Sequence, residues 1–291
     1  MEKFLQLMLS GWALGAIYSI VALGFVLVFK ATSVLNFAHG SFLMMAAYLA
    51  TTFLVVLDMP FIVGLTIIAV TLALLGVVLH YSIMQWMVGK PFFAVVLVTV
   101  GMEIVIRALL LVLYGPLERG KIQKLTTGTI EIGGAVVPTV NIIIFIAAIA
   151  VVVAFLAFFR LSRMGLHMRA VAENLEAATA MGINPNTVYA TAWGIGLLLA
   201  GVGGVLYAHF TASIDLNLSV IGLRAFPAAI LGGLDSIPGA IVGGMVVALI
   251  ENIGSGYVGG EWRDVIAFGI MFLVLMWRPS GLFGTKELVR V

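Results

Sequence analysis

The chain has 291 residues, of which 63% are hydrophobic and only 10% are charged. Soluble domains contain about 45–50% apolar and about 25% charged residues, so a soluble fold could not cover this much apolar surface with polar groups. The composition therefore excludes an ordinary soluble enzyme, a disordered chain and a nucleic-acid-binding protein. The absence of cysteine excludes a disulfide scaffold and thiolate chemistry. A multi-span membrane protein remains.

Apolar runs long enough for helices follow one another along the chain. A helix needs about 20 apolar residues to cross a bilayer, because lipid offers no partner to free backbone groups. The runs are 4–29, 41–57, 61–81, 92–114, 140–159, 188–210, 219–233, 238–250 and 265–277. The run 219–233, with about 15 residues, is marginal for a crossing. We therefore expect one all-α domain over residues 1–291, a polytopic membrane helix bundle with eight or nine transmembrane helices, some short or broken.

The basic residues between the runs predict the orientation, because cytoplasmic loops are enriched in Lys and Arg. If the polar loop at about 160–187 is cytoplasmic, the basic residues inside are Lys30, Lys90, Arg160, Arg163, Arg169, Arg278, Lys286 and Arg290. Those outside are Lys3, Arg119, Lys121, Lys124, Arg224 and Arg263. This count places the N-terminus outside and the C-terminus inside.

The outer loop, at about 115–139, contains one local signal. Residues 129–132 and 135–137 are rich in β-branched side chains and flank Gly133-Gly134. Two glycines between such runs predict a short β-hairpin. The hairpin is either a plain connector or a docking surface for an external partner.

A polar, glycine-containing stretch at 34–40 separates the first two runs without an ordinary loop composition. Irregular backbone at membrane depth survives only inside protein or beside a wet cavity, and half-helices often point at transported solutes. We interpret Asn36, His39 and Gly40 as lining a pathway; an interfacial turn is the alternative. Shifting the chain by 181 residues aligns Asn36 with Asn217, which suggests an inverted repeat and makes Asn217 a further pathway candidate.

Few ionisable groups interrupt the runs. Glu103 and Arg107 are one helical turn apart, so an internal ion pair is favoured over an ion relay. Glu251 stands near the end of a run, which predicts an interfacial position. The four histidines have no metal-ligand spacing, and the sequence contains no catalytic motif and no nucleotide-binding P-loop. Any ATP hydrolysis must therefore take place on another subunit.

The polar loop at about 160–187 contains good helix formers from 168 to 181, then Gly182 and Asn184-Pro185. This pattern predicts one short helix with a glycine C-cap on the cytoplasmic face. The segment is either a solvated connector or a lever that docks on a cytoplasmic partner.

Within that loop, Glu176, Ala177, Ala178 and Gly182 form an EAA-x3-G string that resembles the coupling loop of ABC-importer permeases. The strings at 16–24, 34–40, 181–184 and 225–233 resemble more narrowly the H-type permease of branched-chain amino-acid ABC importers. The resemblance extends over about residues 11–250.

The resemblance implies an importer permease fold in a bacterial inner membrane, with Glu176, Ala177, Ala178 and Gly182 as the coupling residues. It implies four partner subunits: a second, M-type permease, two cytoplasmic ATPases that bind ATP and magnesium, and a periplasmic substrate-binding protein. This chain itself would be non-enzymatic, without cofactor or metal, in contact with lipid and a small solute. Branched-chain or other small amino acids are the expected solutes. Urea or short amides, or an ATP-independent channel or secondary transporter using Glu103 and Arg107 as a gate, are the alternatives.

Overall fold

All nine apolar runs fold as helices in the computed structural model, which describes residues 1–115, 126 and 128–284. The helices are α1 Glu2–Thr32, α2 His39–Ala50, α3 Phe61–Ser82, α4 Phe92–Tyr114, α5 Thr139–Leu161, α8 Pro185–Thr211, α9 Leu218–Gly232, α10 Ile237–Val258 and α11 Arg263–Trp277. A π-helical turn, Thr51–Val56, continues α2. Seven of these segments in the described part are long and apolar enough to span a membrane, while α9 and α11 have only 15 residues each. The expected all-α polytopic bundle is confirmed.

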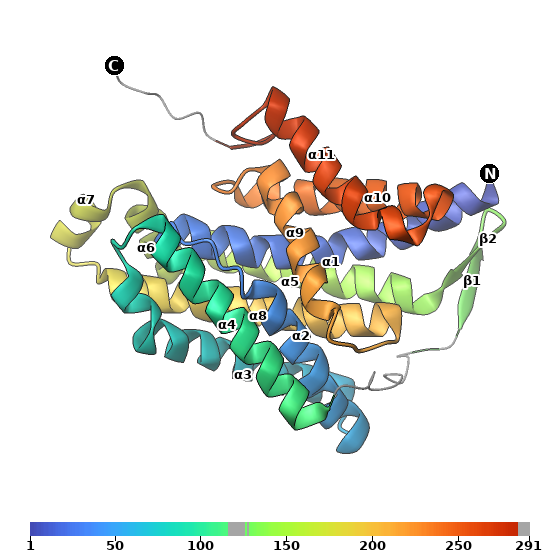
Figure 1. Ribbon diagram of the computed structural model, residues 1–291, viewed down its shortest axis with the longest axis horizontal. Coiled ribbons are helices and arrows are strands. Elements are labelled where there is room, and N and C mark those ends of the chain that lie inside the picture. The colour runs from blue at the N-terminus through green and yellow to red at the C-terminus, as the bar shows by residue number, and fades with distance from the viewer. Residues whose placement is uncertain (116–125, 127, 285–291) are drawn as a thin grey trace.

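The centre of the bundle is the antiparallel pair α1 and α8 (Figure 1). The apolar windows of these two helices are 89% and 83% buried inside the protein, against 17–28% for α3, α4 and α5. The pair packs closely because small residues face each other: a Cβ on Gly24 would lie 2.9 Å from the carbonyl oxygen of Gly196. In lipid, such close backbone packing replaces the hydrophobic effect that drives helices together in water.

Each central helix carries an antiparallel neighbour. α10 lies along α1, where the Asn252 amide donates to the Leu7 carbonyl at 2.6 Å and the Ser19 hydroxyl donates to the Ile241 carbonyl at 2.8 Å. α3 lies along α8 with Phe61 against His209, ring centroids 5.2 Å apart. The packing of α3 against α8 is therefore equivalent to the packing of α10 against α1.

Two half-helices complete the pattern. After α1 and after α8 the chain turns through one left-handed residue, Ser33 (φ 56°) or Ala212 (φ 55°), and α2 or α9 begins inside the bundle. α4 then runs beside α2, and α11 beside α9. The helices α1–α4 thus correspond to α8–α11 with opposite direction, as the repeat hypothesis requires.

The register of this repeat differs from the sequence alignment. Both the ends of α1 and α8 (Thr32, Thr211) and the starts of α2 and α9 (His39, Leu218) are 179 residues apart, not 181. Asn36 Oδ1 accepts from the Ala38 amide, and Asp215 Oδ1 accepts from the Asn217 amide in the same way. Asn36 therefore corresponds to Asp215, and its predicted pairing with Asn217 is wrong.

The two ends of the bundle differ. At one end, called here the hairpin end, strands β1 Thr129–Ile132 and β2 Ala135–Pro138 pair antiparallel beside the start of α1, with Gly133 and Gly134 in the turn at φ 58° and 85°. The predicted hairpin is confirmed. At the opposite end, called the coupling end, α6 Arg163–Glu173 and α7 Leu175–Ala180 connect α5 to α8.

The basic residues divide between these ends largely as the loop count predicts. Those at the coupling end are Lys30, Lys90, Arg160, Arg163, Arg169 and Arg278, and those at the hairpin end are Lys3 and Arg263. Arg119, Lys121, Lys124, Lys286 and Arg290 lie outside the described residues. Arg224 is not a loop residue, because it lies within α9 and reaches a buried carboxylate.

Candidate functional site

The predicted pathway residues lie where the two half-helices meet. Gly40, in the first turn of α2, contacts the backbone of α9: a Cβ there would lie 3.2 Å from the Cα of Gly222 and would overlap the Ser219 carbonyl. The α2–α9 crossing is therefore made by backbone against backbone. A side chain at Gly40 would separate the two half-helices.

His39 and Asn36 are buried next to this crossing. The His39 side chain is fully enclosed between Gly24 and the Phe25 ring, whose centroid is 4.3 Å away. No hydrogen bond of good geometry reaches its ring nitrogens from the described residues, although the Val21 backbone is close enough to interact with the imidazole. Asn36 borders an apolar crevice between Phe25 and Phe226 that is too narrow to admit water.

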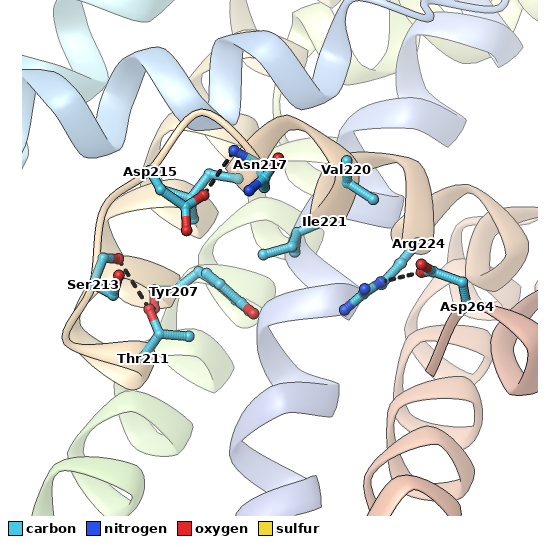
Figure 2. A pocket seen from close by; sticks show the side chains of 10 residues that line it. Tyr207, Thr211, Ser213, Asp215, Asn217, Val220, Ile221, Arg224 and Asp264 are labelled. Carbon is cyan, nitrogen blue, oxygen red and sulfur yellow. Dashed lines mark hydrogen bonds and ion pairs between the residues drawn. The ribbon is translucent and has the colours of Figure 1, made fainter. Parts of the chain in front are cut away.

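Asn217 has a different setting, at the rim of a cavity of about 480 Å³ in the hairpin-end half of the bundle. Figure 2 shows this cavity between the end of α8, the α8–α9 connection, α9 and the start of α11. The lining residues are Tyr207, Thr211, Ser213, Asp215, Asn217, Leu218, Val220, Ile221, Arg224 and Asp264. Of the four predicted pathway residues, Asn217 lines this cavity, while Asn36, His39 and Gly40 lie deeper, around the crossing.

A charged cluster that the sequence did not reveal forms one wall of the cavity. The Arg224 Nε donates to Asp264 Oδ1 at 2.5 Å, and its Nη1 lies 3.7 Å from Glu251 Oε1. The Tyr18 hydroxyl donates to the other oxygen of Glu251 at 3.0 Å. Glu251 is only 1% exposed, and α10 continues for seven residues beyond it to Val258, so the expected position at the end of a span is wrong. The cluster joins α1, α9, α10 and α11 through side chains from four distant parts of the sequence.

The Glu103–Arg107 ion pair is also not formed. Both residues lie on α4, but the ion pairs in the described part of the chain are those of Arg224 with Glu251 and Asp264. Glu103 is half-buried and Arg107 is exposed. One turn of spacing allows such a contact without requiring it, because both side chains are long and have alternative rotamers.

The coupling segment consists of two helices instead of the single helix expected over 168–181. Asn174 separates them with extended backbone (φ −154°), and its Oδ1 caps α7 by accepting from the Ala177 amide at 2.9 Å. An Asn side chain competes well for free backbone donors at a helix start, which explains the break. The Arg169 guanidinium donates to the Phe159 carbonyl and so ties α6 to α5.

α7 projects away from the bundle at the coupling end (Figure 1). Glu176 and Ala177 are exposed on it, whereas Ala178 is 5% exposed and packs inward. Gly182 follows in the left-handed region at φ 84° and ends the segment as a glycine C-cap does. The four predicted coupling residues thus form one compact, protruding unit.

The whole chain matches known proteins. The family profile described as "Branched-chain amino acid transport system / permease component" matches residues 7–275. The chain belongs to this family. The permease is 31% identical to the high-affinity branched-chain amino acid transport system permease protein LivH of Escherichia coli K12, over 99% of this chain and 98% of the relative. It is 30% identical to permease protein BraD of Pseudomonas aeruginosa, with the same coverage.

A second kind of relative also aligns with the permease. Permease protein LivM of Escherichia coli K12 is 24% identical over 91% of this chain and 67% of its own length. No solved structure matches the chain. The expected resemblance to H-type permeases is therefore confirmed, and two different permease proteins named for one transport system share its sequence pattern.

Proposed function

We propose that this permease is one of two membrane subunits of an ATP-driven importer in the bacterial cytoplasmic membrane, and that its solutes are branched-chain amino acids. The observation that carries the proposal is the protruding α7, whose Glu176 and Ala177 are exposed at the coupling end of a protein of this family. A short capped helix outside the bundle offers a rigid handle to a soluble subunit. The coupling end then faces the cytoplasm, consistent with its excess of Lys and Arg.

The cavity supports an amino-acid solute. Its volume of about 480 Å³ falls within the 300–1,000 Å³ typical of small-molecule sites. Arg224 and Asp215 present charges of both signs, as the carboxylate and ammonium of a free amino acid require, and Val220 and Ile221 present aliphatic surface. In this proposal Asn217 lines the entry, and Asn36, His39 and Gly40 lie where the path continues toward the coupling end.

The proposed transport cycle uses ATP hydrolysis on one kind of subunit to move the membrane helices of another. ATP and magnesium bind on two ATPase subunits, which grip α7 here and its counterpart on a second, M-type permease. Closing of the ATPases moves these handles and rocks the helix bundles, so that the path opens to one side at a time. Only a difference in ATP affinity between the two states can drive this change. A binding protein delivers the solute at the hairpin end.

Uptake into vesicles tests the proposal. The full complex is reconstituted with ATP inside, binding protein outside, and radiolabelled leucine, isoleucine or valine. We expect uptake that depends on ATP, stops when the ATPases are omitted and is not competed by urea. ATP-independent uptake at the same rate, or the absence of ATPase subunits from the purified complex, would refute it.

A further inference from the structure

Helix α4 is poorly covered by the rest of the chain. One narrow stripe faces the bundle, made of Val95, Thr99, Met102, Ile106 and Leu110. Elsewhere the helix is open: Ile104 is 59% and Val112 is 81% exposed, and a Cβ on Gly101 would meet nothing within 4 Å. An apolar helix in this position normally faces lipid.

One face of α4 is unsuited to lipid. Val100, Glu103, Arg107 and Leu111 follow one another at helical spacing and are called here the charged α4 face. Glu103 stands halfway along the 23-residue helix, and the exposed Arg107 lies one turn closer to the hairpin end. No ion pair satisfies either residue within the described chain. A charged side chain at the bilayer centre costs about 2.5–3.5 kcal/mol on insertion scales, so these two positions call for a polar cover.

The depth of the charges limits what can cover them. A soluble subunit at the coupling end, or a binding protein at the hairpin end, cannot reach the middle of a membrane-spanning helix. A second membrane-embedded chain can, and the alignment with LivM shows that a different permease protein shares this sequence pattern. Two chains of one fold, related by an axis along the membrane normal, place equivalent helices parallel and at equal depth.

We propose that the charged α4 face is the contact surface for the M-type permease, and that the partner presents a carboxylate to Arg107 and a basic side chain to Glu103. The inference rests on the proposed function, because it takes the second subunit from there, and adds which surface that subunit covers. Oppositely charged groups buried together in such a contact select the partner as well as binding it.

Cross-linking from single cysteines tests the contact, because the chain contains no cysteine of its own. Leu111→Cys, which lies on the charged α4 face and keeps both charges, is labelled with benzophenone maleimide in the full complex in proteoliposomes, irradiated, and its adducts are identified by mass. The matched control is the exposed Val112→Cys, at nearly the same depth but about 100° around the same helix. We expect an M-type adduct from position 111 at a yield at least about tenfold above that of the control. Adducts mainly with lipid, or with a second copy of this chain, would overturn the proposal.

A charge-removal variant gives an independent measurement. Arg107→Leu makes α4 more apolar, so a lipid-facing position would leave the complex intact. If Arg107 meets the partner, the M-type chain recovered per permease falls at least about tenfold, because truncating one side of a buried charge pair is costly. The amount of this chain in the membrane stays unchanged. An unchanged ratio of the two chains would contradict the contact.

The two proposals fail in different ways. If ATP-dependent uptake is present but position 111 gives no M-type adduct, the contact surface is wrong and the importer function stands. If the M-type adduct forms but ATPases and ATP-dependent uptake are absent, the contact surface stands and the importer function is wrong.

Discussion

Replacing Arg224 by methionine removes the cation that joins α9 to α10 and α11 while nearly keeping the length of the side chain. Glu251, only 1% exposed, then keeps the Tyr18 hydroxyl but loses its countercharge. Breaking a buried ion pair from one side costs about 3–5 kcal/mol. Asp264 is half exposed, so its own lost contact adds less than about 1 kcal/mol. We expect Arg224→Met to destabilise the permease by about 3 kcal/mol.

Unfolding in mixed micelles of dodecyl maltoside and SDS measures this change. Arg278→Met is the matched control, because Arg278 is exposed at the coupling end and its side chain donates only to the Leu282 carbonyl in the described chain. Its loss should cost less than about 0.5 kcal/mol. The double variant Arg224→Met/Glu251→Gln should recover about half of the loss, since no unpaired charge then stays buried. Strictly additive effects, or equal effects of the two arginine substitutions, would refute the role of the buried pair.

Three further variants test the α2–α9 crossing at Gly40, the pathway candidate Asn36 and the protruding helix α7. Gly40→Val should reduce the amount of folded permease recovered from membranes by at least about fivefold, because the new side chain overlaps the α9 backbone. The control Gly101→Ala places its methyl group in open space and should leave the yield unchanged. Equal yields of the two variants would contradict the backbone contact at the crossing. Asn36→Leu removes the hydrogen bond that Asn36 Oδ1 accepts from the Ala38 amide, worth about 1 kcal/mol, and should lower the uptake rate more than the yield of complex. Unchanged transport kinetics would remove this residue from the path. Glu176→Lys should abolish the stimulation of uptake by ATP at normal expression. Glu173→Lys, exposed on the neighbouring α6, is the control and should have little effect. Wild-type uptake in the Glu176 variant would contradict the coupling role of α7.

The positions of the spans could be predicted from the sequence, because lipid imposes the same length and apolarity on every crossing helix. The hairpin and the glycine C-cap at Gly182 were predictable for a similar reason, since each depends on a few neighbouring residues. The break between α6 and α7 was missed because Asn174 stands among good helix formers. The preference of Asn for the N-cap position of a helix was the sequence signal that could have indicated this break.

The candidate site was only partly predictable. Asn36, His39 and Gly40 were proposed from the unusual polarity of the stretch at 34–40, and Asn217 from a repeat alignment whose register the structure contradicts. The burial of the first three depends on contacts between helices distant in the sequence. The cluster around Arg224 could not be found in this way, because its members come from four helices with no common spacing. The prediction of a Glu103–Arg107 ion pair was wrong for the opposite reason. The local spacing suggested a contact, but the tertiary structure does not bring the two side chains together.

The backbone contact between Gly40 and Gly222 has a mechanical consequence. At this point no side chain separates the two backbones, so they are already in van der Waals contact. We therefore expect the two half-helices to move together as one unit. An opening for the solute is then expected from displacement of the outer helices around this unit, and not from separation of the half-helices themselves.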